Sequence, residues 1–150
     1  MKVCIGGTFN RLHKGHKFLI KKALEIAGEK GYVFIGITSG KMIESKRNVE
    51  SYKEREKAIE QFLLEKKLSI KVKIGPIYDK FGPSIKEDFD AIVVSPETET
   101  TADEINKERE KLQKKPLKII LISFVLAEDD LPISSTRILR SEINENGKIL

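Results

Sequence analysis

Short apolar runs and longer amphipathic stretches alternate along this chain. Five of the runs are rich in Val, Ile and Phe and are bounded by glycine, proline or polar residues. Such nearly continuous apolar runs are typical of strands that are buried on both faces of a sheet. We therefore expect strands at residues 2–7, 32–38, 69–75, 90–96 and 117–124.

Between these runs, apolar residues recur with the period of an α-helix. Two of the stretches begin at Ser51 and Thr101, each of which precedes a glutamate at capping-box spacing. Pro116 bars further helix after the second of these stretches. Four helices are expected: from Lys14 to a stop at Gly31, over residues 51–67 and 101–115, and over residues 132–147 with a stop at Gly147.

Strands that alternate with helices predict a parallel sheet with helices on both faces, because right-handed crossovers return each strand in the same direction. The fold expected is a doubly wound, Rossmann-like α/β domain with a five-stranded parallel sheet, formed by residues 1–150 as a single domain. In such folds ligands bind beyond the carboxyl ends of the strands, where the strand order reverses.

Composition narrows the possible functions. The 150 residues carry a net charge of +5, and their charges interleave along the helices rather than forming a basic stripe. This pattern argues against nucleic acid as a partner and suits a small anionic substrate. One cysteine and two histidines cannot supply the usual zinc ligands. No run is long enough to cross a bilayer, so we expect a cytoplasmic protein without a membrane partner.

Both histidines lie in "GGTFNRLHKGH", directly after the first expected strand. Gly6 and Gly7 allow close approach of a ligand to the backbone, and the Thr8 hydroxyl can bind phosphate oxygens. The segment is neither a dinucleotide fingerprint nor a Walker loop. His13 and His16 have two possible roles: one is a helix cap and a half-buried core residue, and the other is donation to a reacting phosphate at a helix N-terminus.

A second candidate is "PISSTRIL", which places three hydroxyls at the expected start of the last helix. One serine would suffice as an N-cap. Ser134, Ser135 and Thr136 followed by Arg137 also fit an anion site, in which Arg137 acts as a mobile phosphate clamp.

Two expected helices carry an arginine on an apolar face. For Arg55 the favoured interpretation is a side chain that extends to a surface carboxylate. For Arg109, with Asn106 beside it, a place in the cleft is favoured, because their helix follows the carboxyl end of the fourth strand.

The two motifs together resemble those of the nucleotidyltransferase superfamily, which has an H-x-G-H motif and a late I-S-S-T-x-R-type motif. They stand here as "HKGH" at 13–16 and "ISSTR" at 133–137. Within that superfamily the chain is most similar to the archaeal branch of phosphopantetheine adenylyltransferases, with "GGTFNRLHKGH", "YKERE" and "VVSPETETTADEINKER" in agreement.

The resemblance implies transfer of the adenylyl group of ATP to 4'-phosphopantetheine, giving dephospho-coenzyme A and pyrophosphate, with Mg²⁺. It implies that Thr8 orients the attacking phosphate, that His16 stabilises the α-phosphoryl transition state and that His13 binds nucleotide phosphates. Lys41, with Lys46 as a rival, would bind the acceptor phosphate. The other implied contacts are Gly7, Phe9, Gly15, Ser134, Ser135, Thr136 and Arg137 for ATP, and Asn106 and Arg109 for the acceptor.

Other functions stay open at this point. An adenylyltransferase for nicotinamide mononucleotide or flavin mononucleotide would share both motifs. A regulatory module would bind ATP without turnover, and an RNA-binding domain would bind in a steeply salt-dependent way. The oligomeric state is left open.

Overall fold

A computed structural model describes residues 1–150, and its architecture confirms the predicted fold class. Five parallel strands form one sheet in the order β3-β2-β1-β4-β5. The elements are β1 (Lys2–Gly7), α1 (Lys14–Ala27), β2 (Tyr32–Thr38), η1 (Gly40–Met42), α2 (Tyr52–Leu64), β3 (Lys71–Ile77), η2 (Gly82–Ser84), β4 (Ala91–Val94), α3 (Glu99–Lys111), β5 (Lys118–Leu121) and α4 (Ser135–Leu139).

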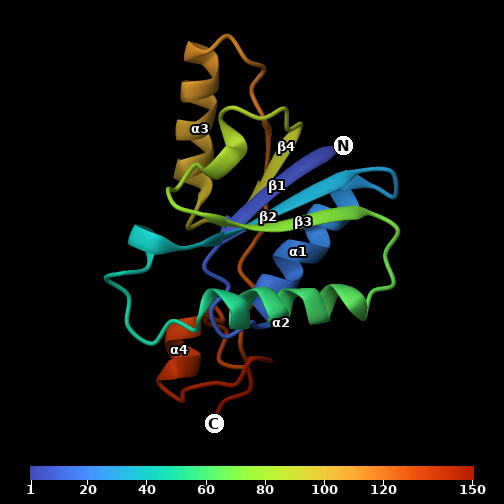
Figure 1. Cartoon of the computed structure of the whole chain (residues 1–150). Helices are drawn as coiled ribbons and strands as arrows, with labels where there is room; N and C mark the ends of the chain where they lie inside the picture. The colour runs from blue at the N-terminus through green and yellow to red at the C-terminus, as the bar shows by residue number, and fades with distance from the viewer.

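The sheet separates two apolar cores, because alternate side chains of each strand point to opposite faces. On one face Val3 and Ile5 of β1 pack with Ile20 of α1 and Ile59 of α2. On the other face, Cys4, Phe34 and Ile92 pack with Ile105 of α3. Figure 1 shows α1 and α2 together on one side and α3 on the other. The strand order reverses between β1 and β4, so the ligand site is expected there.

Burial along the strands follows their place in the sheet. Six of the seven residues of β2 are buried, whereas the edge strand β3 alternates between exposed and covered positions. Exposed Lys71 and Lys73 lie on this edge, where charge discourages pairing with a further strand. None of the helices combines the length and the apolarity that a bilayer crossing requires.

The helix boundaries differ from the prediction by a few residues, and α2 (Tyr52–Leu64) and α3 (Glu99–Lys111) both end earlier than expected. Helix α1 ends at Ala27, and Gly28 takes the left-handed φ of 79° that closes it, so Gly31 is not its stop. Helix α3 begins at Glu99 rather than at Thr101. Its N-cap is Thr98, whose hydroxyl accepts a bond from the Ser95 N–H at 3.2 Å.

The expected last helix is much shorter than predicted. Helix α4 ends at Leu139, and the chain then turns so that Ile143 and Ile149 pair as an antiparallel bridge. Gly147 lies in that turn with a φ of 82°, where a Cβ would come within 3.0 Å of Ile133 and Ala127. The residues after α4 therefore fold back, and Ile143 packs with Ala127 and Ile133 in a small separate apolar cluster.

Candidate active site

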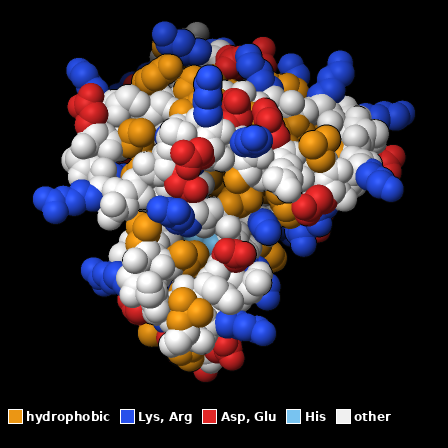
Figure 2. Space-filling view, turned by 60° about the horizontal axis from the view of Figure 1, so that its bottom comes forward, with side chains coloured by type: hydrophobic (Ala, Val, Ile, Leu, Met, Phe, Trp, Pro, Cys, Tyr) orange, Lys and Arg blue, Asp and Glu red, His pale blue; other side chains and the backbone are white.

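A cleft of about 820 Å³ opens beyond the carboxyl ends of β1 and β4, a size typical of small-molecule sites. Figure 2 shows a small patch of histidine surface in this region, between the body of the domain and the lower lobe. The structure brings the two motifs together across the cleft although over a hundred residues separate them. The predicted residues that line it are Gly7, Thr8, Phe9, His13, Gly15, His16, Ser134, Ser135 and Thr136.

His13 and His16 form a reciprocal cap at the start of α1. The Nδ1 of His13 accepts bonds from the N–H groups of Gly15 at 3.1 Å and of His16 at 3.4 Å. The Nδ1 of His16 accepts from the His13 N–H at 3.2 Å, and the two rings stack with centroids 3.6 Å apart. Because both Nδ1 atoms accept, each neutral ring carries its proton on Nε2.

Both imidazoles are held in the neutral form. Burial lowers the pKa of His13 to about 4. Burial, together with the neighbouring His13, lowers the pKa of His16 to about 3. At neutral pH each ring therefore offers one fixed Nε2–H donor in a site at a helix N-terminus, where anions are favoured.

Phe9 and Gly15 shape the space around the histidines. Phe9 takes a left-handed φ of 51°, rare for a bulky residue, and its buried ring lies 5.4 Å from that of His16. A Cβ at Gly15 would sit 3.0 Å from the His13 ring. Glycine at this position therefore lets the cap form without displacing His13.

Thr8 is the centre of a polar group at the end of β1. Its Oγ1 accepts bonds from the Thr38 hydroxyl and from the Lys46 Nζ, each at 3.0 Å. Lys46 lines the cleft, whereas Lys41 is exposed outside it. Of the two rival lysines, the structure places Lys46 and not Lys41 beside Thr8.

Arg109 and Asn106 do not line the cleft, which corrects their predicted role. The Arg109 side chain is 2% exposed, and its Nη1 donates to the backbone carbonyls of Ser84, Ile85 and Glu87. Asn106 exchanges two hydrogen bonds with the backbone of Leu117. All the hydrogen bonds that these two side chains make thus join α3 to neighbouring segments.

The "ISSTR" segment divides into parts with different partners. Ser134 is the N-cap of α4, accepting from the Arg137 N–H at 3.2 Å, and the Ser135 hydroxyl donates to the Asn10 carbonyl. Ser134, Ser135 and Thr136 nevertheless all line the cleft. The single-cap interpretation therefore accounts for Ser134 only.

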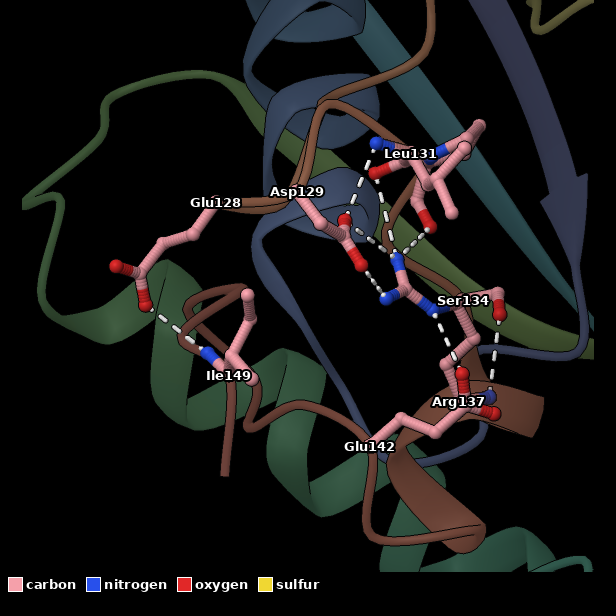
Figure 3. Close-up of polar contacts among 8 residues, drawn as sticks. Glu128, Asp129, Leu131, Ser134, Arg137, Glu142 and Ile149 are labelled. Carbon is pink, nitrogen blue, oxygen red and sulfur yellow. Dashed lines mark hydrogen bonds and ion pairs between the residues drawn. The ribbon is translucent and has the colours of Figure 1, made fainter.

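Arg137 does not line the cleft, where a phosphate clamp would be expected. Its guanidinium pairs with the Asp129 carboxylate, and its Nε donates to Glu142 at 3.4 Å (Figure 3). The Nη1 also donates to the Pro132 carbonyl at 3.1 Å. The Arg137 guanidinium holds the pKa of Asp129 below its usual range. Arg137 therefore stabilises the part of the chain that follows β5 by joining α4 to Asp129, Pro132 and Glu142.

Sequence reasoning gave no role in the site to two residues, Asn10 and Arg55. Asn10 is buried and joins three segments: its amide donates to the Asn48 carbonyl, its Oδ1 accepts from the Glu50 N–H, and its carbonyl accepts from Ser135. Arg55 is completely buried on α2 instead of extending to a surface carboxylate, so that prediction is wrong. An asparagine in a turn is common, and nothing local marks Asn10; the only local signal of Arg55 is its position on an apolar helix face, which does not indicate its partners.

Charge in the cleft favours an anion. The ionisable side chains of its lining, other than the two neutral histidines and Cys4, are Lys46, Arg47, Lys80 and Glu97. Burial raises the pKa of the Cys4 thiol to about 12, so it is uncharged. No group of three His, Cys, Asp or Glu side chains converges as a metal site.

The sheet order, the cleft at its switch point and the paired imidazoles at a helix N-terminus agree with the nucleotidyltransferase class, which comparison with known proteins shows. The chain belongs to the Cytidylyltransferase-like family, whose pattern matches residues 4–141. It is 48% identical over 151 residues to a protein of Methanosarcina mazei named phosphopantetheine adenylyltransferase, covering 99% of this chain and 96% of that protein.

The chain is also similar to a longer, bifunctional protein and to a protein of known crystal structure. A Thermoplasma volcanium protein, named bifunctional phosphopantetheine adenylyltransferase/NTP phosphatase, is 42% identical over all of this chain, which covers 45% of that protein. A crystal structure of an Archaeoglobus fulgidus protein described as of unknown function superposes with a TM-score of 0.72 at 36% identity, over 81% of this chain and 89% of the other.

Proposed function

We propose that this chain transfers the adenylyl group of ATP to 4'-phosphopantetheine, releasing pyrophosphate and forming dephospho-coenzyme A. The observation that carries the proposal is the likeness, over nearly the full length of both chains, to the Methanosarcina protein of that name. The cleft supports it, because cationic side chains and fixed neutral donors meet where the phosphates of two substrates would converge.

The acceptor phosphate is assigned to Thr8. Because Thr8 Oγ1 already accepts bonds from Thr38 and Lys46, its own proton is free to be donated to a phosphate oxygen. The Lys46 ammonium would lie close to the same phosphate. A phosphate is already an anionic nucleophile, so its attack on the α-phosphorus of ATP needs alignment rather than a general base.

The α-phosphoryl group is assigned to His16, with His13 beside it. Both rings are fixed by the cap, so their Nε2–H donors need no reorganisation as negative charge develops. The remaining phosphates are assigned to Ser135, Thr136 and the backbone near Ser134. Arg137 is left out of this assignment because its guanidinium is paired with Asp129 and Glu142.

The rest of the acceptor would occupy the branch of the cleft under α3. Its walls combine apolar side chains with the hydroxyls of Ser84 and Thr98, a mixture suited to a chain of methylenes and amides. The apolar walls of this branch include Phe34, Met42, Ile77, Phe81 and Ile105.

Mg²⁺ is proposed to enter with ATP as part of the substrate. Mg²⁺ in phosphoryl-transfer sites is commonly held by substrate phosphates and one or two carboxylates. Glu97 is the carboxylate of the cleft lining and is the residue that would approach the ion. The ion would neutralise charge on the triphosphate.

An acceptor panel tests the proposal. Purified protein with Mg²⁺ and ATP is given 4'-phosphopantetheine, nicotinamide mononucleotide or flavin mononucleotide, and pyrophosphate release is measured. Of the three acceptors, only 4'-phosphopantetheine is expected to give pyrophosphate release. Faster pyrophosphate release with either mononucleotide would refute the proposal that 4'-phosphopantetheine is the acceptor. ATP binding without pyrophosphate release in any mixture would indicate a regulatory module.

A matched pair of lysine variants tests the placement of the acceptor. Lys46→Ala should raise the KM for 4'-phosphopantetheine by roughly tenfold or more, the effect of one lost charge-assisted bond. Lys41→Ala changes a lysine of the same loop outside the cleft and should leave that KM unchanged. A larger rise in KM for Lys41→Ala than for Lys46→Ala would contradict the assignment of the acceptor phosphate to Thr8.

A further inference from the structure

Arg55 links the site to α2 through backbone carbonyls alone. Its Nε donates to the Glu50 carbonyl at 2.9 Å. Its Nη1 donates to the carbonyls of Thr8 at 3.1 Å and of Thr38 at 2.7 Å. One guanidinium therefore joins the chain beyond β1, the end of β2 and the segment that leads into α2.

The carbonyls that Arg55 binds lie where the sheet stops. The β1–β2 ladder ends at the pair Gly7 and Ile37, so the next residues, Thr8 and Thr38, have no further strand pairing with each other. The Thr8 carbonyl belongs to the peptide that joins Thr8 to Phe9. Phe9 has a φ of 51°, which is costly for a bulky side chain. Arg55 thus holds the peptide at which the chain bends toward the histidines.

Arg55 also carries a buried charge that no carboxylate contacts directly; burial lowers its pKa, and the nearby Glu50 carboxylate offsets this only in part. Its side chain is 0% exposed, none of the ion pairs of the molecule includes it, and its Nη2 has no hydrogen-bond partner. A buried charge is costly unless it is paired. An anion bound at the Thr8 hydroxyl would lie near Arg55, which donates to the Thr8 carbonyl, and would reduce the cost of burying this charge.

We propose that Arg55 is a positioning residue that acts through Thr8. It holds the Thr8–Phe9 peptide so that the Thr8 hydroxyl and the Phe9 ring face the cleft, and its buried charge favours the acceptor phosphate there. This inference rests on the proposed function, since that function assigns the acceptor phosphate to Thr8. It concerns a side chain that does not line the cleft itself.

A double-mutant cycle tests the coupling, using Arg55→Lys, Thr8→Val and the two combined. Lysine keeps the charge, but its single nitrogen cannot reproduce the fork that joins three carbonyls. R55K should lower kcat/KM for the acceptor by roughly 10–100-fold, as small misplacements do, while the Kd for ATP changes by less than about twofold. In the T8V background R55K should have no further effect, whereas additive losses would overturn the proposal.

Arg109→Lys is the matched control. Arg109 is a buried arginine on α3 that also binds only backbone carbonyls, but none of them belongs to Thr8 or Thr38. R109K should lower the melting temperature as R55K does and keep its turnover per folded molecule. An equal loss of turnover in both variants would mean that general destabilisation explains R55K.

A spectroscopic measurement on the unmodified chain covers the case in which R55K does not fold. Adding 4'-phosphopantetheine should shift the ¹⁵N resonance of the Arg55 Nε and leave that of Arg109 unchanged. An unshifted Arg55 signal at saturating acceptor would overturn the coupling.

The acceptor panel separates this inference from the proposed function. If the chain prefers another phosphate acceptor, the proposed function fails, and the same cycle with that acceptor still supports or overturns the role of Arg55. If transfer to 4'-phosphopantetheine is normal and the cycle is additive, only the role of Arg55 fails. Absence of transfer to every acceptor overturns both.

Discussion

Replacement of His16 by alanine removes two functions of one ring. The Nδ1 of His16 accepts the His13 N–H, and the ring stacks on His13 and contacts Phe9. Its Nε2–H is the donor assigned to the α-phosphoryl group. His16 can therefore have a structural and a catalytic role at the same time, so both the stability and the turnover of a variant must be measured.

The two losses have different sizes. A lost hydrogen bond costs about 0.5–1.5 kcal/mol of stability, and loss of the ring contacts costs a similar amount, so we expect His16→Ala to lower the free energy of unfolding by about 1–3 kcal/mol. Loss of one preorganised donor to a transition state typically costs about 2.7–4 kcal/mol, which is a hundredfold to a thousandfold in kcat. The Kd for ATP should change little, because the interaction is weak in the ground state.

His16→Gln separates the two effects. Glutamine at the third helical position can accept the N-cap N–H, so this variant should recover part of the stability. Its amide does not reproduce the Nε2–H, so turnover should stay low. Melting temperature, Kd for ATP and kcat are measured on one preparation of each variant, well below both melting temperatures. Normal turnover per folded molecule in His16→Ala would refute the catalytic role.

Three further outcomes follow from the observed contacts. Arg109→Ala should lower the free energy of unfolding by at least about 3 kcal/mol, because it leaves several buried carbonyls without a donor; unchanged denaturation would contradict this. Arg137→Ala should lower the melting temperature and leave the Kd for ATP unchanged, whereas a loss of ATP affinity equal to that of Ser135→Ala would return Arg137 to the phosphate site. The free energy of unfolding should be highest above pH 6.5 and fall toward pH 4, because the unfolded histidines bind protons that His13 and His16, with pKa values of about 4 and 3, do not. The slope is up to about 1.4 kcal/mol per pH unit for each histidine, and His16→Ala should reduce it in a pH series of denaturation curves.

The elements that the sequence predicted well are those decided by local patterns. The run "YVFIGIT" forms β2 over the same residues, since a buried central strand needs apolar side chains on both faces. The pairing of "HKGH" with "ISST" across the cleft follows from the parallel sheet, which brings the carboxyl ends of its strands to one edge. The last helix was predicted too long, because a helical pattern cannot report that Ile143 and Ile149 pair with each other.

The choice between Lys41 and Lys46 illustrates what a local pattern leaves out. Both lysines follow β2 in one polar segment, and both could reach its end. The path of that segment is fixed by Asn10, which binds the backbone of Asn48 and Glu50 about forty positions away. These bonds set which lysine meets Thr8, and they depend on the whole sheet being formed. Composition and spacing therefore could not decide between the two.

The position of Arg55, unlike that of Arg109, follows from the same geometry that creates the site. A parallel ladder ends at the carboxyl edge of the sheet, and that edge leaves backbone groups without partners both for a ligand and for the fold. An arginine presents five donors on a rigid plane, so a single side chain can serve several carbonyls from different segments. Arg55 serves three carbonyls, two of them at this edge, and Arg109 serves four that lie between β3 and β4 and between α3 and β5. A helical wheel marks both as misplaced polar residues on apolar faces, but only the long-range arrangement of carbonyls shows that one of them lies against Thr8 and the other does not.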